Sequence, residues 1–189
     1  MKGIMLCSVD GDYHGIDRCN PLGDYLENPK IGSQITSFFD YSVDPETQTI
    51  IYSLTNIDEC QKIVKLLKEC GENCETIVFC SCEEEISIYD SEFIGYDVCS
   101  QNIDDSPLAK NMIKMPEFCT DDDFYSGFYK MLDAYELKTY ADDLNEYGLL
   151  NSYDIANMLC ERCNSASETL NEIFFIPSEF TAYKVYLIK

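Results

Sequence analysis

Apolar side chains recur at spacings of three and four between Ile57 and Cys70, which places them on one face of an α-helix. Asn56 can cap the start of this helix, and Gly71 suits the left-handed backbone that ends many helices. The segment 75–82 is centred on a β-branched, apolar Thr-Ile-Val-Phe run and predicts a strand. This helix and this strand are the clearest elements in the pattern.

Two strands are predicted before the helix, at 34–41 and 47–54. Pro45 lies between them and favours a turn because its ring fixes φ, so the two strands should form a hairpin. The order of strand 47–54, helix 57–70 and strand 75–82 predicts a right-handed βαβ crossover with parallel strands. A mixed β-sheet is therefore expected.

The remaining pattern predicts short strands at the start and middle of the chain and mostly helices after residue 120. The strands are expected at 4–9, 86–89, 93–99 and 180–188, and the helices at 122–135, at 138–147 and from 151 or 152 to 163. We therefore expect one α+β domain over residues 1–189, with a helical C-terminal half that closes with a final strand. A boundary between two lobes would fall in the proline-containing connection 100–119.

Composition favours a folded protein. Hydrophobic residues make up 46% of the chain, and 14 Tyr and 10 Phe distinguish it from acidic disordered chains, which lack aromatic residues. No apolar run approaches the roughly 20 residues that span a bilayer, and the first residues are too short and too soon acidic for a signal peptide. We expect a cytoplasmic location.

The charge is the most informative bulk property. Asp and Glu number 35 against 13 Lys and Arg, which gives a net charge of −22, and no basic residue occurs between Lys68 and Lys110. Such a surface repels phosphate backbones and anionic lipid, so direct binding to nucleic acid or membrane is not expected. It attracts cations or a basic protein. The simpler interpretation is that the charge only keeps the protein soluble.

The acidic stretch supplies the candidate partner-binding residues, which are Glu83, Glu84, Glu85, Asp90, Glu92, Asp104 and Asp105. The last third of the chain adds tyrosines interleaved with acids, namely Tyr125, Tyr129, Tyr135, Tyr140, Tyr147, Tyr153, Tyr183 and Tyr186. Aromatic anchors surrounded by carboxylates are typical of a surface that binds a basic partner. The alternative is that half of these tyrosines are core or half-buried surface residues.

Asp10, Asp12 and His14 form a candidate site for metal binding or catalysis, because two carboxylates after a strand can hold Mg²⁺. The haloacid dehalogenase superfamily places an Asp-x-Asp at such a position. Its motif continues to Thr or Val where this chain has His14, and its downstream Lys and acidic pair are not evident. Asp-Gly-Asp is also a common turn sequence.

Eleven cysteines without an export signal indicate reduced thiols that pack as small hydrophobes. Cys70, Cys74, Cys80 and Cys82 come close to the count of a zinc site, but Cys70 completes a helix face and Cys80 and Cys82 share a strand face. Cys160 and Cys163 belong to a helical apolar stripe. We expect no cofactor.

These observations favour a small acidic protein that binds a basic protein partner, such as a toxin or a nucleic-acid-binding protein. An immunity-type inhibitor and an inhibitor that mimics nucleic acid both fit. An enzyme is less expected, because no catalytic motif is specific. The alternatives are a metal-assisted hydrolase that uses Asp10 and Asp12, and a structural or regulatory protein without a ligand.

Overall fold

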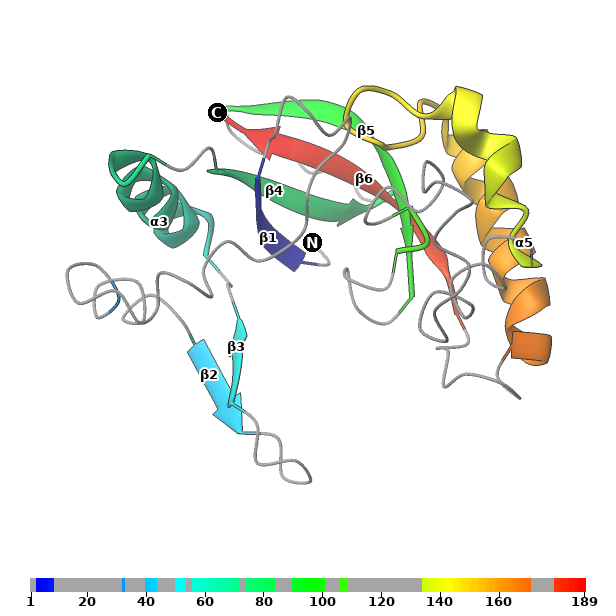
Figure 1. Cartoon of the computed structure of the whole chain (residues 1–189), viewed down its shortest axis with the longest axis horizontal. Coiled ribbons are helices and arrows are strands. Elements are labelled where there is room, and N and C mark those ends of the chain that lie inside the picture. The colour runs from blue at the N-terminus through cyan, green and yellow to red at the C-terminus, as the bar shows by residue number, and fades with distance from the viewer. Residues whose placement is uncertain are drawn as a thin grey trace, which may run out of the picture.

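The computed structural model shows a chain of mixed helices and strands (Figure 1), which confirms the α+β composition. The structure describes residues 3–8, 40–43, 50–53, 56–71, 74–83, 90–100, 106–108, 134–170 and 179–189, together with Gly32. The connection 100–119 and the strand predicted at 86–89 fall mostly or wholly outside these residues. The single-domain organisation therefore stays a prediction.

A four-stranded antiparallel sheet forms the centre of the described structure. Its strand order is β1-β4-β6-β5, with the strands at Gly3–Ser8, Cys74–Ser81, Thr181–Ile188 and Ser91–Cys99. The C-terminal strand β6 lies between β4 and β5, so Val185 pairs with Phe79 on one side and Gly95 on the other. The strands predicted near residues 4, 77, 93 and 183 are confirmed.

The predicted hairpin is present as a separate two-stranded sheet. β2 (Asp40–Val43) pairs antiparallel with β3 (Ile50–Ser53) across the segment that contains Pro45. Residues 34–39 of the first predicted strand lie outside the described part of the chain, and β2 continues to Val43, past the predicted end at residue 41. The local turn chemistry therefore predicted the pairing correctly.

The expected βαβ crossover is wrong. β3 belongs to the hairpin sheet, while the two edges of β4 are occupied by β1 and β6, both antiparallel. No edge of β4 is left for a parallel β3, and each pairing between described strands is antiparallel. The four-stranded sheet is thus not mixed. The order strand-helix-strand does not by itself decide which strands pair.

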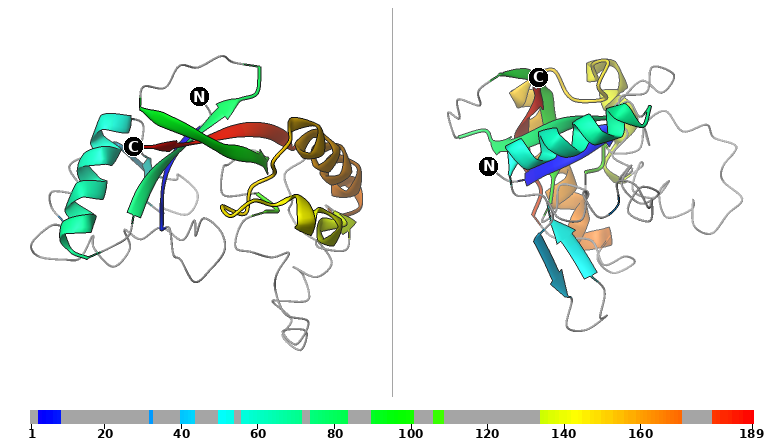
Figure 2. Two further views of the ribbon diagram at one scale, coloured as in Figure 1. Left: turned by 90° about the horizontal axis from the view of Figure 1, so that it is seen from above. Right: turned by 90° about the vertical axis from the view of Figure 1, so that its left-hand side faces the viewer.

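Helix α3 (Ile57–Glu69) agrees closely with the sequence pattern. The side chain of Asn56 accepts a hydrogen bond from the Asp58 backbone N–H at 2.9 Å, and Gly71 follows with φ of 95°. The buried face consists of Cys60, Ile63, Val64 and Leu67, which packs against β4 and β1. Figure 1 and the left view of Figure 2 place α3 and α5 near opposite ends of the sheet.

The helices after residue 134 differ in part from the prediction. The segment expected to be α-helical at 138–147 is a 3-10 helix, η4 (Leu137–Asp143), followed by a turn. The Asn145 side chain accepts from the backbone N–H groups of Tyr147 and Leu149, and this local bonding competes with helix continuation. Helix α5 (Tyr153–Leu170) is longer than expected. The helix predicted at 122–135 lies almost wholly outside the described residues.

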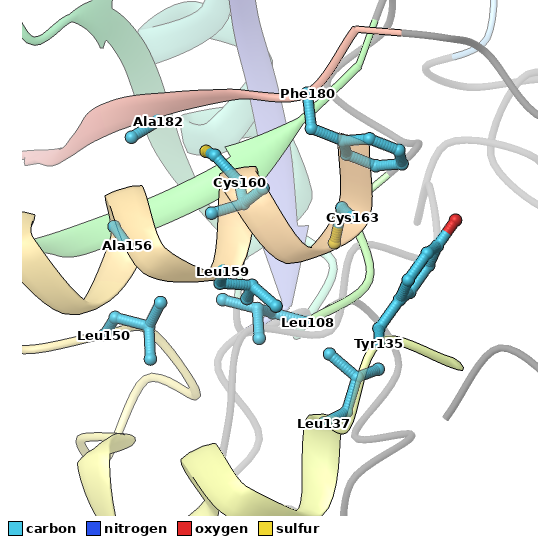
Figure 3. Close-up of a cluster of buried hydrophobic side chains, with 11 residues drawn as sticks. Leu108, Tyr135, Leu137, Leu150, Ala156, Leu159, Cys160, Cys163, Phe180 and Ala182 are labelled. Carbon is cyan, nitrogen blue, oxygen red and sulfur yellow. The ribbon is translucent and has the colours of Figure 1, made fainter. Parts of the chain in front are cut away.

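Two buried clusters cover the two faces of the sheet, because neighbouring residues of a strand point to opposite sides. One contains Phe79, Val185 and Leu149. The other joins α5 and η4 to β5 and β6. Figure 3 shows Leu159, Cys160 and Cys163 of α5 in the middle of this cluster, with Phe180 and Ala182 on one side and Leu137 and Leu150 on the other.

Among the described residues, no helix combines the length and apolarity needed to cross a membrane.

Candidate docking surface and other candidate sites

The predicted metal and catalytic turn lies outside the described residues. Asp10, Asp12 and His14 all fall between β1 and Gly32, where nothing is described. The hydrolase alternative therefore stays a prediction.

The structure does not bring the four cysteines of the zinc candidate together as a ligand group. Within the described part of the chain, no group of three or more His, Cys, Asp or Glu side chains is placed to hold a metal ion. Cys70 follows the last turn of α3 and is exposed, so the expectation that it completes the buried helix face is wrong. Cys74 and Cys80 are buried in β4, whereas Cys82 lies beyond the strand and donates to the Ala182 carbonyl at 3.3 Å.

The thiols of Cys160 and Cys163 are buried in the core, as the helical stripe predicts. Burial, and to a smaller extent the nearby Cys82, raises the pKa of the Cys160 thiol to about 12. Burial also raises the pKa of Cys163, with Cys160 as the second cause, and it raises the pKa of Cys60 to about 12. Only the thiolate attacks electrophiles. These three cysteines are therefore built to be unreactive.

We expect iodoacetamide at pH 8 to alkylate Cys70 in the native protein long before Cys60, Cys160 and Cys163. A thiol whose pKa is about 12 is roughly one part in ten thousand thiolate at that pH, and burial blocks the reagent as well. Peptide mapping by mass spectrometry measures each site, and the denatured chain should take eleven labels. Equal rates at Cys70 and Cys160 would show that the α5 stripe is not in the core.

The acidic residues proposed as a partner-binding patch are only partly described. Glu83, Asp90 and Glu92 are exposed, and Glu92 forms an ion pair with Lys189 at 3.1 Å. Glu84, Glu85, Asp104 and Asp105 lie outside the described residues. The patch as a whole therefore stays a prediction.

One carboxylate of this acidic stretch is not on the surface. Asp97 is fully buried, and its Oδ1 accepts from the Ser106 hydroxyl at 2.6 Å and from the Val98 N–H at 2.8 Å. The Cys99 thiol lies 3.6 Å from its Oδ2. The expectation that the carboxylates between Lys68 and Lys110 form a charged surface is therefore wrong for Asp97. Its hydrogen bonds satisfy the buried carboxylate and attach the segment 106–108 to β5.

Four aromatic side chains form a continuous row over β6, β5 and the start of α5. The ring centroids lie 5.6 Å apart for Tyr186 and Phe93, 5.1 Å for Phe93 and Tyr96, and 5.9 Å for Tyr96 and Tyr153. Phe93 and Tyr153 are each 44% exposed, while Tyr96 and Tyr186 are half-buried. We call these four residues the aromatic row. They offer an apolar, largely edge-to-face surface that is open to solvent.

A β-bulge brings two members of the row together. Phe93 and Tyr96 are three residues apart, so in a regular strand they would point to opposite faces of the sheet. The register shifts between Phe93 and Gly95, and the extra residue returns Tyr96 to the face that Phe93 occupies. Sequence reasoning missed the row. Its one local signal was Gly95 inside a predicted strand, since such a glycine often marks a bulge.

Carboxylates lie at the α5 end of the aromatic row. The Asp143 carbonyl accepts from the Asn151 backbone N–H at 3.3 Å and from the Asn151 side chain at 3.1 Å, which holds the end of η4 against the start of α5. Tyr153 and Asp154 are the first two residues of α5. We call Asp142, Asp143 and Asp154 the acidic junction. Asp142 and Asp154 are exposed, and none of the three forms an ion pair with another described residue.

The tyrosines weighed in the sequence divide between core and surface. Tyr135 and Tyr183 are buried, Tyr140, Tyr147 and Tyr186 are half-buried, and Tyr153 is exposed. Tyr125 and Tyr129 lie outside the described residues. Five of these six described tyrosines are therefore core or half-buried residues, as the alternative predicts, and the binding role of the tyrosines stays a prediction.

Comparison of the chain with family models, with curated proteins and with solved structures finds no match.

Proposed function

We propose that this protein binds a basic protein partner, in the manner of an immunity-type inhibitor or a mimic of nucleic acid. The observation that supports the proposal best is the exposed aromatic row with the acidic junction at its end. Interface hot spots are enriched in aromatic residues, and surrounding charges select the partner. A toxin or a nucleic-acid-binding protein has the required basic surface.

The distribution of charge supports this proposal. Among the carboxylates whose burial the structure describes, only Asp97 is buried, so the others of this group contribute to the surface field. The ion pairs found among described residues involve Glu75, Glu92 and Glu136, which leaves the acidic junction unneutralised. A field of one sign increases the rate of encounter with a cationic partner. The same field disfavours acidic competitors.

Lys184 of β6 lies opposite Tyr96 in the sheet register and adds one positive charge on the face of the aromatic row. The attraction must therefore come from the acidic junction and from more distant carboxylates. In this proposal the carboxylates set the rate of association, whereas the rings supply contact area. We place the protein in the cytoplasm, because eleven cysteines are most easily kept reduced there.

Two triple variants with the same change in net charge test which surface is used. We expect Asp142→Asn, Asp143→Asn and Asp154→Asn together to lower the association rate by about three-fold or more at low salt, with little change in melting temperature, because exposed charges steer association but stabilise little. The matched variant carries Glu83→Gln, Glu84→Gln and Glu85→Gln, the set favoured by the sequence. Surface plasmon resonance on the partner captured from native lysate gives the rates.

A larger effect of the glutamine variant would assign the interface to the stretch around Glu83. Equal effects would mean that only net charge matters, which contradicts a localised surface. Rates that are unchanged in both variants and independent of salt would overturn the electrostatic proposal, because exposed charges separated by more than about 8 Å are screened at 0.15 M salt.

A further inference from the structure

We infer that the aromatic row recognises arginine side chains of the partner in preference to lysine. This inference rests on the proposed function and specifies which cationic side chain of the partner binds the aromatic row. It follows from the arrangement of the rings, from their exposure and from the position of the carboxylates.

The rings of the row are not stacked in parallel on one another. Phe93 and Tyr96 are inclined at 69° and Tyr96 and Tyr153 at 55°, so the edge of one ring lies toward a face of its neighbour and covers at most one face of that ring. Phe93 and Tyr153 expose 44% of their surface at two points of the row. A planar cation of the width of a guanidinium can lie on one ring face while its edge contacts the next ring.

The ammonium group of a lysine side chain should bind this surface more weakly than a guanidinium does. Lysine carries a compact, strongly hydrated charge that needs carboxylate partners, and the carboxylates lie at one end of the row rather than along it. Lys184 already places a cation opposite Tyr96. A guanidinium is more weakly hydrated and stacks on aromatic faces, so the rings strengthen its binding in addition to the attraction of Asp154, the residue that follows Tyr153 in the first turn of α5. The row therefore distinguishes two cations of equal charge.

Fluorescence anisotropy with labelled nona-arginine and nona-lysine at one ionic strength tests the inference. We expect the native protein to bind nona-arginine several-fold more tightly. The double variant Phe93→Leu, Tyr153→Leu should lose about two- to five-fold in arginine affinity for each ring and little in lysine affinity, because a leucine keeps apolar surface but has no ring face. Tyr153→Phe should keep the preference.

Met158→Leu is the matched control, because Met158 is 60% exposed on α5 but is not part of the row. Each variant is first shown to fold by its circular dichroism melt. Equal affinity of the native protein for the two peptides, or an unchanged arginine preference in the double leucine variant, would overturn the inference and leave the proposed function standing. Absence of binding to either peptide would overturn both.

Discussion

Leu67→Asp should unfold the protein or lower its stability by about 4 kcal/mol or more. Leu67 is fully buried in the face of α3 that also contains Cys60, Ile63 and Val64. An aspartate there loses the buried leucine and places a carboxylate where the described neighbours offer no positive charge. The free energy of unfolding of a domain is only about 5–15 kcal/mol, so this single substitution removes a large part of it.

Thermal unfolding followed by circular dichroism measures the effect, and Lys65→Asp is the matched control. Lys65 is exposed on the same helix, so the new carboxylate stays in water and should change stability by less than about 1 kcal/mol. A melting temperature unchanged by Leu67→Asp would mean that the buried face of α3 is wrongly assigned. A loss as large in Lys65→Asp would indicate a helix-propensity effect instead.

The sequence predicted those elements whose determinants are local. The apolar spacing, the Asn56 cap and Gly71 together define α3 within one residue, and β-branched runs define β4 and β6. The pairing of strands could not be predicted in the same way. β6 reaches its place between β4 and β5 from the far end of the chain, and no local pattern encodes that partner.

The candidate docking surface was harder to predict than the fold. Its rings come from β6, β5 and α5, and two of them share a face only because of the bulge before Gly95. Charge counting identified an acidic protein, but it could not distinguish exposed Glu83 from buried Asp97. Burial of a polar residue depends on its hydrogen-bond partners, and Ser106 lies on a different segment.

Although Gly95→Ala adds only one carbon atom, we expect it to lower the free energy of unfolding by about 3 kcal/mol. Gly95 has φ of 143°, a conformation that side chains rarely adopt. A Cβ would lie 2.8 Å from the Leu149 Cβ, 2.9 Å from the Asn145 Nδ2 and 3.1 Å from the Leu150 carbonyl oxygen. Backbone strain and overpacking each cost about 1–3 kcal/mol. For a chain of this length the melting temperature should fall by roughly 6–12 °C.

Gly71→Ala separates the two causes of that loss. Gly71 also has a positive φ, of 95°, but nothing lies within 4 Å of the added Cβ, so only backbone strain remains and the cost should be about 1 kcal/mol. The difference between the two variants measures how tightly the turn before α5 packs on the bulge. If that packing orients Phe93 and Tyr96, Gly95→Ala should also reduce the arginine preference of the folded fraction, whereas Gly71→Ala should leave it intact. Equal losses of stability would show that the bulge relaxes freely, and the aromatic row would then not be held by Gly95.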